Sequence, residues 1–366
     1  MEAGSKIRVM LVDDSASFRN LLAAILGREA DIEVVGAASS GLSALMKLPD
    51  LQPDCIVLDI QMPGMDGLKT LREVKRLYPA MGVLICSAAS KEGVDLTVEA
   101  LSSGALDFVT KAPRMATGES LLERLRNEIV PTLRAFKRYG RAVPSSPVGD
   151  RAEKDDVRLA VAGARDIIAV GVSTGGPSAL RTILPEIPAE IQATFLVVQH
   201  MPPIFTYQLA EQLNAASKLR VKEAEDGEQA CQGTVYIAPG DFHLEIRKRD
   251  ESAVIQLTQS PQENSVRPAV DVLFRSIASS GLAPRAAGIV MTGMGQDGFS
   301  GAQMLKERGG VIIAQDQASS LVWGMPRFVV EAGIADKVCS LSDIPRVIAR
   351  LTARSQTASD KKTPRN

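Results

Sequence analysis

The sequence predicts two α/β domains in one chain: a doubly wound N-terminal domain with a five-stranded parallel sheet, and a C-terminal domain whose parallel sheet carries an extension of antiparallel strands. The chain has 366 residues, which is too many for one ordinary hydrophobic core. Short apolar strands alternate with amphipathic helices from Lys6 to Tyr139, and again from Asp166 onward. Between these two stretches, Gly140–Gly163 is rich in Pro, Ser, Gly and charged residues, which is typical of a linker.

In the first stretch, five apolar segments predict strands, and the amphipathic segments between them predict helices on both faces of the sheet. The strands are expected at Ile7–Val12, Glu33–Ala37, Cys55–Leu58, Val83–Cys86 and Asp107–Val109. The helices are expected at Ser17–Gly27, Gly41–Leu48, Leu68–Leu77, Gly93–Ser102 and Ser120–Phe136. Pro131 is expected to kink or restart the last helix.

Polar residues follow these strands where each one ends: Asp13-Asp14, Asp59, Ser87 and Lys111. Each of them alone is explained by a helix cap or a solvated charge, but five such residues at successive strand ends favour a shared site. Three converging carboxylates repel one another, and Mg²⁺ would offset that repulsion with hard oxygen ligands. A carboxylate beside such a metal can attack a phosphoryl group, while a lysine and a hydroxyl hold the incoming oxygens.

Asp13-Asp14, Asp59 followed by MPGMDG, Ser87-Ala88 and Lys111-Ala112-Pro113 together resemble the receiver domain of two-component response regulators, over about residues 6–125. The resemblance implies that Asp59 accepts phosphate from a histidine kinase and that Asp13 and Asp14 help to hold Mg²⁺. It also places Phe108 at the aromatic position that changes rotamer on phosphorylation, although a buried strand residue explains Phe108 equally well.

The second stretch opens with Ile167–Pro177 (IIAVGVSTGGP), where a buried strand turns into a helix that begins near Ser178. Ser173 lies at the carboxyl end of this strand, where glycines permit a tight turn and ligands gather in open α/β sheets. It is the candidate nucleophile, with the Thr174 hydroxyl beside it. The alternatives are a phosphate or dinucleotide loop, or a simple tight turn. The G-x-G-x-x-G spacing of a dinucleotide loop is not present.

The next strand, Thr194–Gln199, ends at His200, one crossover after the strand that ends at Ser173. This placement favours His200 as the general base over a merely structural histidine. The second histidine, His243, alternates with apolar residues and is expected on the polar face of a half-buried strand, solvated or near the cleft rim. That strand belongs to Val221–Gln259, which predicts short antiparallel strands appended to the parallel sheet.

A third apolar strand, Gly288–Met291, leads into a glycine-rich loop and then into a helix at Phe299–Glu307. Asp297 in this loop either caps the helix or accepts the Nδ1–H of His200 as the orienting acid. The backbone amides of Met294 and Gly295 are candidate oxyanion donors. Asp316, which follows the strand Val311–Gln315, is the rival acid, and periodicity does not separate the two.

Four motifs, GVSTGGP at 171–177, QHMPP at 199–203, APGDFH at 238–243 and MTGMGQDG at 291–298, resemble the protein-glutamate methylesterase family over about residues 166–350. The resemblance implies Ser173 as nucleophile, His200 as base and Asp297 as acid, with Thr174 and the Met294 amide near the reacting carbonyl. It implies methyl-accepting chemotaxis receptors as substrates, deamidation of certain receptor glutamines, and a hydrolase that needs no cofactor.

The expected division is a receiver domain at 6–125, a helix and linker at 126–165, a catalytic domain at 166–354 and a disordered tail at 355–366. The unphosphorylated receiver is expected to cover the Ser173 edge of the catalytic domain. Two other functions fit parts of the sequence. One is a non-catalytic, phosphorylation-dependent scaffold that binds receptors. The other is a nucleotide-binding module built on GVSTGG, against which the lack of a lysine and of Rossmann spacing counts.

The bulk composition narrows the class of protein further. Hydrophobic residues make up 45% and charged residues 23%, the balance of a soluble globular protein. A formal net charge of −1 predicts no binding to nucleic acid or to an acidic membrane. No apolar run reaches the ~18 residues of a membrane span, so no membrane insertion is expected. The four cysteines are far apart and the N-terminus lacks a signal-peptide pattern, so a cytoplasmic protein without disulfides or a zinc site is expected.

Overall fold

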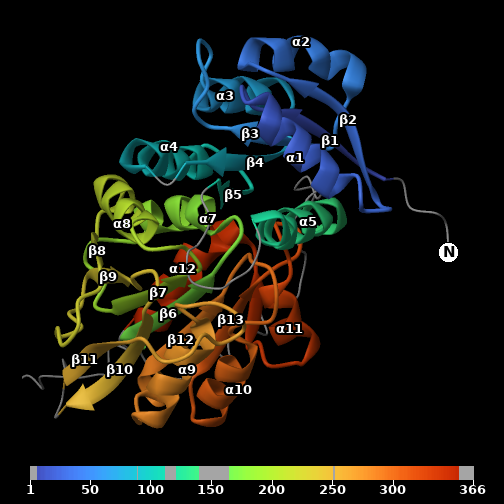
Figure 1. The fold of residues 1–366 in the computed structure, drawn as a ribbon. Helices are drawn as coiled ribbons and strands as arrows, with labels where there is room; N and C mark the ends of the chain where they lie inside the picture. Colours follow the sequence, from blue (N-terminus) through green and yellow to red (C-terminus); the bar gives the residue numbers. More distant parts are fainter. Residues whose placement is uncertain (1–5, 89, 112–120, 140–164, 250–251, 354–366) are drawn as a thin grey trace, which may run out of the picture.

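A computed structural model describes residues 6–88, 90–111, 121–139, 165–249 and 252–353 of the chain. They form two α/β domains that pack against each other, the N-terminal one above the C-terminal one in Figure 1. The predicted linker at Gly140–Gly163 and the predicted tail at 355–366 lie outside the described residues.

The N-terminal domain is the predicted five-stranded parallel sheet, in the order β2-β1-β3-β4-β5. Its strands are β1 (Ile7–Val12), β2 (Ile32–Ala38), β3 (Cys55–Asp59), β4 (Gly82–Ser87) and β5 (Asp107–Thr110). Its helices are α1 (Ala16–Leu26), α2 (Gly41–Leu51), α3 (Gly67–Leu77), α4 (Lys91–Ser102) and α5 (Leu121–Tyr139). β3 lies at the centre of the sheet and is buried along its whole length, which is why it reads as a continuous apolar run ending in Asp59.

Side-chain caps fix where these helices begin. The Ser15 hydroxyl accepts a hydrogen bond from Phe18 N, so α1 begins immediately after the aspartates that end β1. Asp66 caps α3 in the same way. Helix α5 continues through Pro131, so the helix does not restart there. Its apolar face packs into the same core as β1 and α1.

The C-terminal domain has a seven-stranded parallel sheet in the order β14-β13-β12-β6-β7-β9-β8. Its strands are β6 (Ile167–Val172), β7 (Thr194–Gln199), β8 (Arg220–Glu223), β9 (Thr234–Ile237), β12 (Ala286–Val290), β13 (Val311–Gln315) and β14 (Lys337–Cys339). The antiparallel extension was predicted too broadly. β8 and β9 run parallel to β7, because β8 returns from β7 through a helical crossover. Only β10 (His243–Arg249) and β11 (Ser252–Thr258) are antiparallel, and they form a separate two-stranded sheet.

Helices cover both faces of this larger sheet. α7 (Gly176–Ile183), α8 (Phe205–Ala216) and α12 (Ile344–Thr352) pack on one face. α9 (Val270–Ser279), α10 (Phe299–Glu307) and α11 (Met325–Glu331) pack on the other. None of the helices in the described ranges is both long and apolar enough to cross a bilayer.

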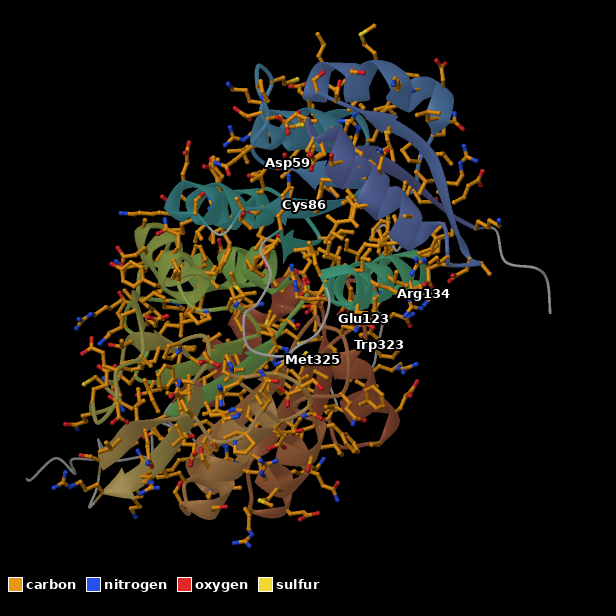
Figure 2. All side chains as sticks on the ribbon, viewed as in Figure 1. Asp59, Cys86, Glu123, Arg134, Trp323 and Met325 are labelled. Atoms are coloured by element: carbon orange, nitrogen blue, oxygen red, sulfur yellow. The ribbon has the colours of Figure 1, made fainter. Side chains whose placement is uncertain are left out.

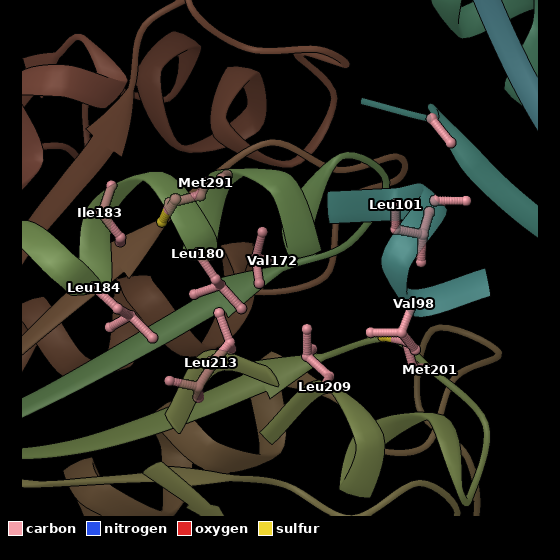
Figure 3. Packing of buried hydrophobic residues seen from close by; sticks show 14 of the residues in the cluster. Val98, Leu101, Val172, Leu180, Ile183, Leu184, Met201, Leu209, Leu213 and Met291 are labelled. Carbon is pink, nitrogen blue, oxygen red and sulfur yellow. The ribbon is translucent and has the colours of Figure 1, made fainter. Parts of the chain in front are cut away.

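The two domains share a continuous apolar core. α4 of the N-terminal domain packs against α7 and α8 (Figure 1). Figure 3 shows Val98 of α4 beside Met201, which follows the end of β7, and both side chains are buried. The N-terminal domain therefore lies over the carboxyl end of β7, where His200 is found.

Candidate functional site

The strand order of the larger sheet reverses at β6, with β7 on one side and β12 on the other. The loops that leave the carboxyl ends of β6, β7 and β12 therefore diverge at one place, which is where open α/β sheets bind their ligands. Ser173, His200 and Asp297 belong to these three loops.

Ser173 and His200 follow residues that are register partners. Val172 of β6 pairs with Gln199 of β7, and His200 N donates a hydrogen bond of 3.3 Å to Val172 O. Neighbouring strands lie about 4.8 Å apart, so the two residues emerge side by side. Among the described residues, no hydrogen bond joins the Ser173 hydroxyl to the His200 ring. Contacts between a nucleophile and its general base tighten when substrate binds.

His200 contacts Asp297 through Nε2, which lies 2.8 Å from Asp297 Oδ2. The prediction that Nδ1 makes this contact was wrong. Nε2 lies farther from the main chain than Nδ1, and it is the atom that reaches from the end of β7 to the loop after β12. Nδ1 is therefore the nitrogen left for the Ser173 hydroxyl.

The Asp297 carboxylate is almost fully buried and is surrounded by donors. These are His200 Nε2 at 2.8 Å, Val270 N at 2.6 Å, Asp271 N at 3.0 Å, Asn264 Nδ2 at 2.9 Å and Gly298 N at 3.0 Å. Two of them are backbone amides in the first turn of α9, where the helix dipole favours a negative charge. Burial acts to raise the pKa of Asp297, but the hydrogen bond and charge of His200 and these amides outweigh it and lower the pKa.

The rival acid, Asp316, is held within its own turn. Its Oδ1 accepts hydrogen bonds from the backbone N and the hydroxyl of Ser319 at 2.8 and 2.6 Å. The acid that contacts His200 is therefore Asp297.

The expectation for His243 was wrong, because this side chain is completely buried. Its Nδ1 accepts a hydrogen bond from Ala269 N at 3.2 Å, and its Nε2 lies 3.1 Å from Pro261 O, to which it donates. The loop between these two residues crosses over the start of β10 and covers the face that was expected to be polar. His243 thus fixes both ends of the loop that leads into α9.

Three buried polar residues that the sequence analysis did not single out hold the loops of the site. The Thr292 hydroxyl donates to Thr174 O at 2.9 Å and accepts from Val322 N at 3.0 Å. Gln315 Oε1 accepts from Thr292 N at 2.8 Å, and Gln199 Nε2 donates to Ser173 O at 3.1 Å. The rule that polar residues at the carboxyl ends of strands belong to a site would have identified all three, because each of them lies at such a strand end.

The loop that carries the predicted oxyanion donors lies against the candidate nucleophile. A Cβ atom on Gly293 would come within 2.8 Å of the Cβ of Ser173, so glycine is what permits this approach. Met294 and Gly295 follow directly in the same loop. Gly324 N and Met325 N both donate to Gly293 O, which fastens the loop from the other side.

The N-terminal domain contacts this site directly. The Thr174 hydroxyl donates to Asp107 Oδ2 at 2.6 Å, and Gly175 N donates to Leu106 O at 3.1 Å. Phe108 stacks on Phe205, with ring centroids 4.4 Å apart. Burial raises the pKa of Asp107, although the hydrogen bond from Thr174 opposes the shift. Residues 106–108, at the start of β5, therefore cover the loop of the candidate nucleophile.

The predicted acidic site is assembled in the N-terminal domain. Asp13, Asp14 and Asp59 each offer a carboxylate oxygen, and these oxygens lie within 4.8 Å of one another, a donor set that suits Mg²⁺. Lys111 Nζ lies 2.7 Å from a carboxylate oxygen of both Asp13 and Asp59. Burial raises the pKa of Asp59 despite this ion pair.

The buried Ser87 hydroxyl donates to Gly93 O at 3.1 Å. Figure 2 shows Asp59 in the upper domain, well separated from Met325 in the lower one.

Two protein families match the two domains of this chain. Residues 9–125 match the response regulator receiver domain, and residues 168–348 match the CheB methylesterase family. A protein-glutamate methylesterase/protein-glutamine glutaminase of Trichodesmium erythraeum is 40% identical over 94% of this chain and 99% of its own length. A protein of the same name from Pyrococcus abyssi is 39% identical over 95% of this chain and 94% of its own.

A solved structure, the CheB methylesterase catalytic domain of Thermotoga maritima, is 44% identical and covers 51% of this chain and 98% of that one, with a TM-score of 0.49. The chain belongs to the protein-glutamate methylesterase/protein-glutamine glutaminase family. It combines a receiver domain with a methylesterase domain, as the sequence motifs predicted.

Proposed function

We propose that this protein is a phosphorylation-activated hydrolase that removes methyl esters from glutamate side chains of methyl-accepting chemotaxis receptors and deamidates certain receptor glutamines. The single observation that carries the proposal is that His200, which emerges beside Ser173, contacts the buried carboxylate of Asp297. Family membership over almost the whole chain supports the choice of substrate.

In the proposed reaction, the Ser173 hydroxyl attacks the ester carbonyl while Nδ1 of His200 takes its proton. Asp297 orients the ring through Nε2 and stabilises the imidazolium that forms. The amides of Met294 and Gly295 and the Thr174 hydroxyl stabilise the oxyanion. Methanol leaves with the proton held by His200, and water then hydrolyses the acyl-enzyme through the same groups. With a glutamine side chain, ammonia leaves in place of methanol. The hydrolytic steps use no metal.

Control by phosphorylation follows from the contacts between the domains. In this structure, Asp107 accepts a hydrogen bond from the Thr174 hydroxyl, and the start of β5 covers the loop that carries Ser173. We propose that this arrangement of the domains is the inactive one. A histidine kinase would supply the phosphoryl group to Asp59. Asp13, Asp14 and Asp59 would hold Mg²⁺, which offsets the charge of the phosphoryl oxygens. Ser87 and Lys111 would bind those oxygens, and Phe108 would leave its position on Phe205, which shifts the population toward separated domains.

The proposed domain limits are residues 6–125 for the receiver domain and residues 166–354 for the catalytic domain. The intervening residues 126–165 contain the rest of α5 and the predicted linker. The proposed location of the enzyme is the cytoplasm, where its kinase and the methylated receptor segments would meet it.

The test is the release of methanol from membranes that carry methylated receptors. The full-length protein should release methanol, and release should rise when a small-molecule phosphodonor is added. Ser173→Ala should abolish release, whereas Ser279→Ala, at the exposed end of α9, should leave it unchanged. A wild-type protein that binds receptors but releases no methanol would instead favour the non-catalytic scaffold.

A further inference from the structure

We propose that Asn264 is a positioning residue of the hydrolase, whose side-chain amide holds the Asp297 carboxylate in place for His200 and keeps it apart from a second carboxylate, that of Asp271. This inference rests on the proposed function. It concerns a residue that lies in a turn between two elements and belongs to none of the four sequence motifs.

The turn that carries Asn264 is well defined. Glu263 N donates to Val266 O at 3.1 Å, and Val266 N donates to Glu263 O at 3.0 Å, which closes a two-residue turn. Its two central residues, Asn264 and Ser265, have φ angles of +52° and +64°. This is the geometry of a type I′ turn, for which asparagine is well suited because it tolerates positive φ. The Glu263 carboxylate also bonds to Arg275 of α9, which fastens the turn to that helix.

The amide of Asn264 serves two carboxylates at once. Its Nδ2 lies 2.9 Å from Asp297 Oδ1 and 2.9 Å from Asp271 Oδ2, so each of its two hydrogens has an acceptor. Both carboxylates are almost fully buried. Two negative charges this close repel each other, and a shared donor between them offsets the repulsion. Burial together with the charge on Asp297 raises the pKa of Asp271 to about 6, although its own hydrogen bonds oppose the shift.

The position of the loop does not depend on the Asn264 side chain. His243 binds both Pro261 O and Ala269 N, so it anchors the loop on either side of the turn. The ion pair between Glu263 and Arg275 is a further anchor. Removing the amide therefore changes the environment of Asp297 while the backbone around it stays fixed.

Loss of the amide should be visible in the dependence of activity on pH. Without the shared donor, the pair of carboxylates keeps a proton up to a higher pH, and a protonated pair is a weaker acceptor for His200 Nε2–H. When the pH is lowered, a variant without the amide should therefore lose activity at a higher pH than the wild type does. The titratable and charged groups that face this pair are His200 after β7, Glu263 in the turn and Arg275 on α9. Asp107 of the receiver interacts with His200 rather than with the pair itself.

Asn264→Gly is the decisive variant, because glycine adopts positive φ freely and keeps the turn while removing only the amide. Ser265→Gly is the matched control, since it makes the same change one residue later and leaves the amide in place. Methanol release is measured from pH 5 to 9 on the full-length protein with phosphodonor, together with the melting temperature. Asn264→Gly should lower kcat between about tenfold and about a hundredfold with KM unchanged, and move the acid limb of kcat/KM to higher pH. Ser265→Gly should match the wild type.

Two results would overturn the inference. One is wild-type kcat and pH dependence in Asn264→Gly. The other is a fall in kcat that comes with a large drop in melting temperature and no movement of the acid limb, because that pattern marks a merely structural role. In both cases the wild type still releases methanol, which distinguishes the failure of this inference from a failure of the proposed function, in which the wild type itself is inactive.

Discussion

The Thr174 hydroxyl donates a hydrogen bond of 2.6 Å to Asp107 Oδ2 across the boundary between the two domains. Thr174 is adjacent to the candidate nucleophile, and Asp107 opens the last strand of the receiver sheet, one residue before Phe108. The contact therefore joins the candidate hydrolytic site to β5, which is separated only by β4 from β3, the strand that ends in the proposed phosphorylation site, Asp59.

Replacing Asp107 by alanine should raise the activity of the unphosphorylated protein. A hydrogen bond to a charged group contributes about 1.5–3 kcal/mol, so its loss should increase basal methanol release by about ten- to a hundredfold at most. Glu92→Ala, an exposed substitution in α4 of the same domain, is the control and should leave the basal rate unchanged. An unchanged basal rate in Asp107→Ala would show that this contact does not restrain the hydrolase.

Replacing Asp59 by asparagine should leave basal methanol release intact and abolish its stimulation. The amide is nearly isosteric with the carboxylate but cannot accept a phosphoryl group. The measurement is methanol release with and without a small-molecule phosphodonor, with Asp50→Asn on the exposed face of α2 as control. Stimulation that persists in Asp59→Asn would contradict the assignment of this residue.

Removal of divalent cations should abolish stimulation by the phosphodonor without affecting basal methanol release. The three carboxylates of Asp13, Asp14 and Asp59 form a donor set for Mg²⁺, whereas the proposed hydrolytic steps use only side chains and backbone amides. Addition of EDTA should therefore abolish stimulation by the phosphodonor and leave basal methanol release unchanged, and excess Mg²⁺ should restore stimulation. If chelation also removed basal release, a metal would be needed at the hydrolytic site.

The strand ends were predictable because parallel strands place their carboxyl ends at one edge of a sheet. This rule was sufficient to bring Asp13 and Asp59 together, and likewise Ser173 and His200. It carries no information on side-chain orientation, and for that reason the wrong nitrogen of His200 was paired with Asp297.

Residues in the irregular loops were beyond the reach of sequence patterns. His243 alternates with apolar residues along its strand, and such alternation indicates that only the apolar face of the strand is buried. The other face is buried here by a loop that begins 18 residues later in the chain. Asn264 lies within that loop, and its place beside Asp297 depends on the hydrogen bonds that His243 makes at both ends of it.

Replacing His243 by alanine should destabilise the protein and reduce its activity together. The ring is fully buried, so the change opens a cavity and leaves Ala269 N and Pro261 O without their partner. We expect a loss of about 2–4 kcal/mol in the free energy of unfolding of the catalytic domain. Chemical denaturation measures the loss, with Gln229→Ala, an exposed residue outside the loop, as control. A change below about 0.5 kcal/mol would show that the loop is held by other contacts.

The raised pKa of Asp271 predicts how stability depends on pH. Its pKa is about 6 in the folded protein, against 3.8 for an ordinary aspartate. A group whose pKa is raised on folding stabilises the protein when it is protonated, and this contribution is lost as the pH rises from about 4 through about 6. Asp271→Asn has no carboxyl group to ionise, so the free energy of unfolding of the wild type relative to this variant should fall by about 1–3 kcal/mol between pH 4 and pH 7. Denaturation curves at several pH values measure this difference, and Asp226→Asn, an exposed substitution, serves as the control. A difference that stays constant over the whole range would mean that Asp271 is ionised as readily in the folded protein as in the unfolded chain, and that its carboxylate does not feel the charge of Asp297.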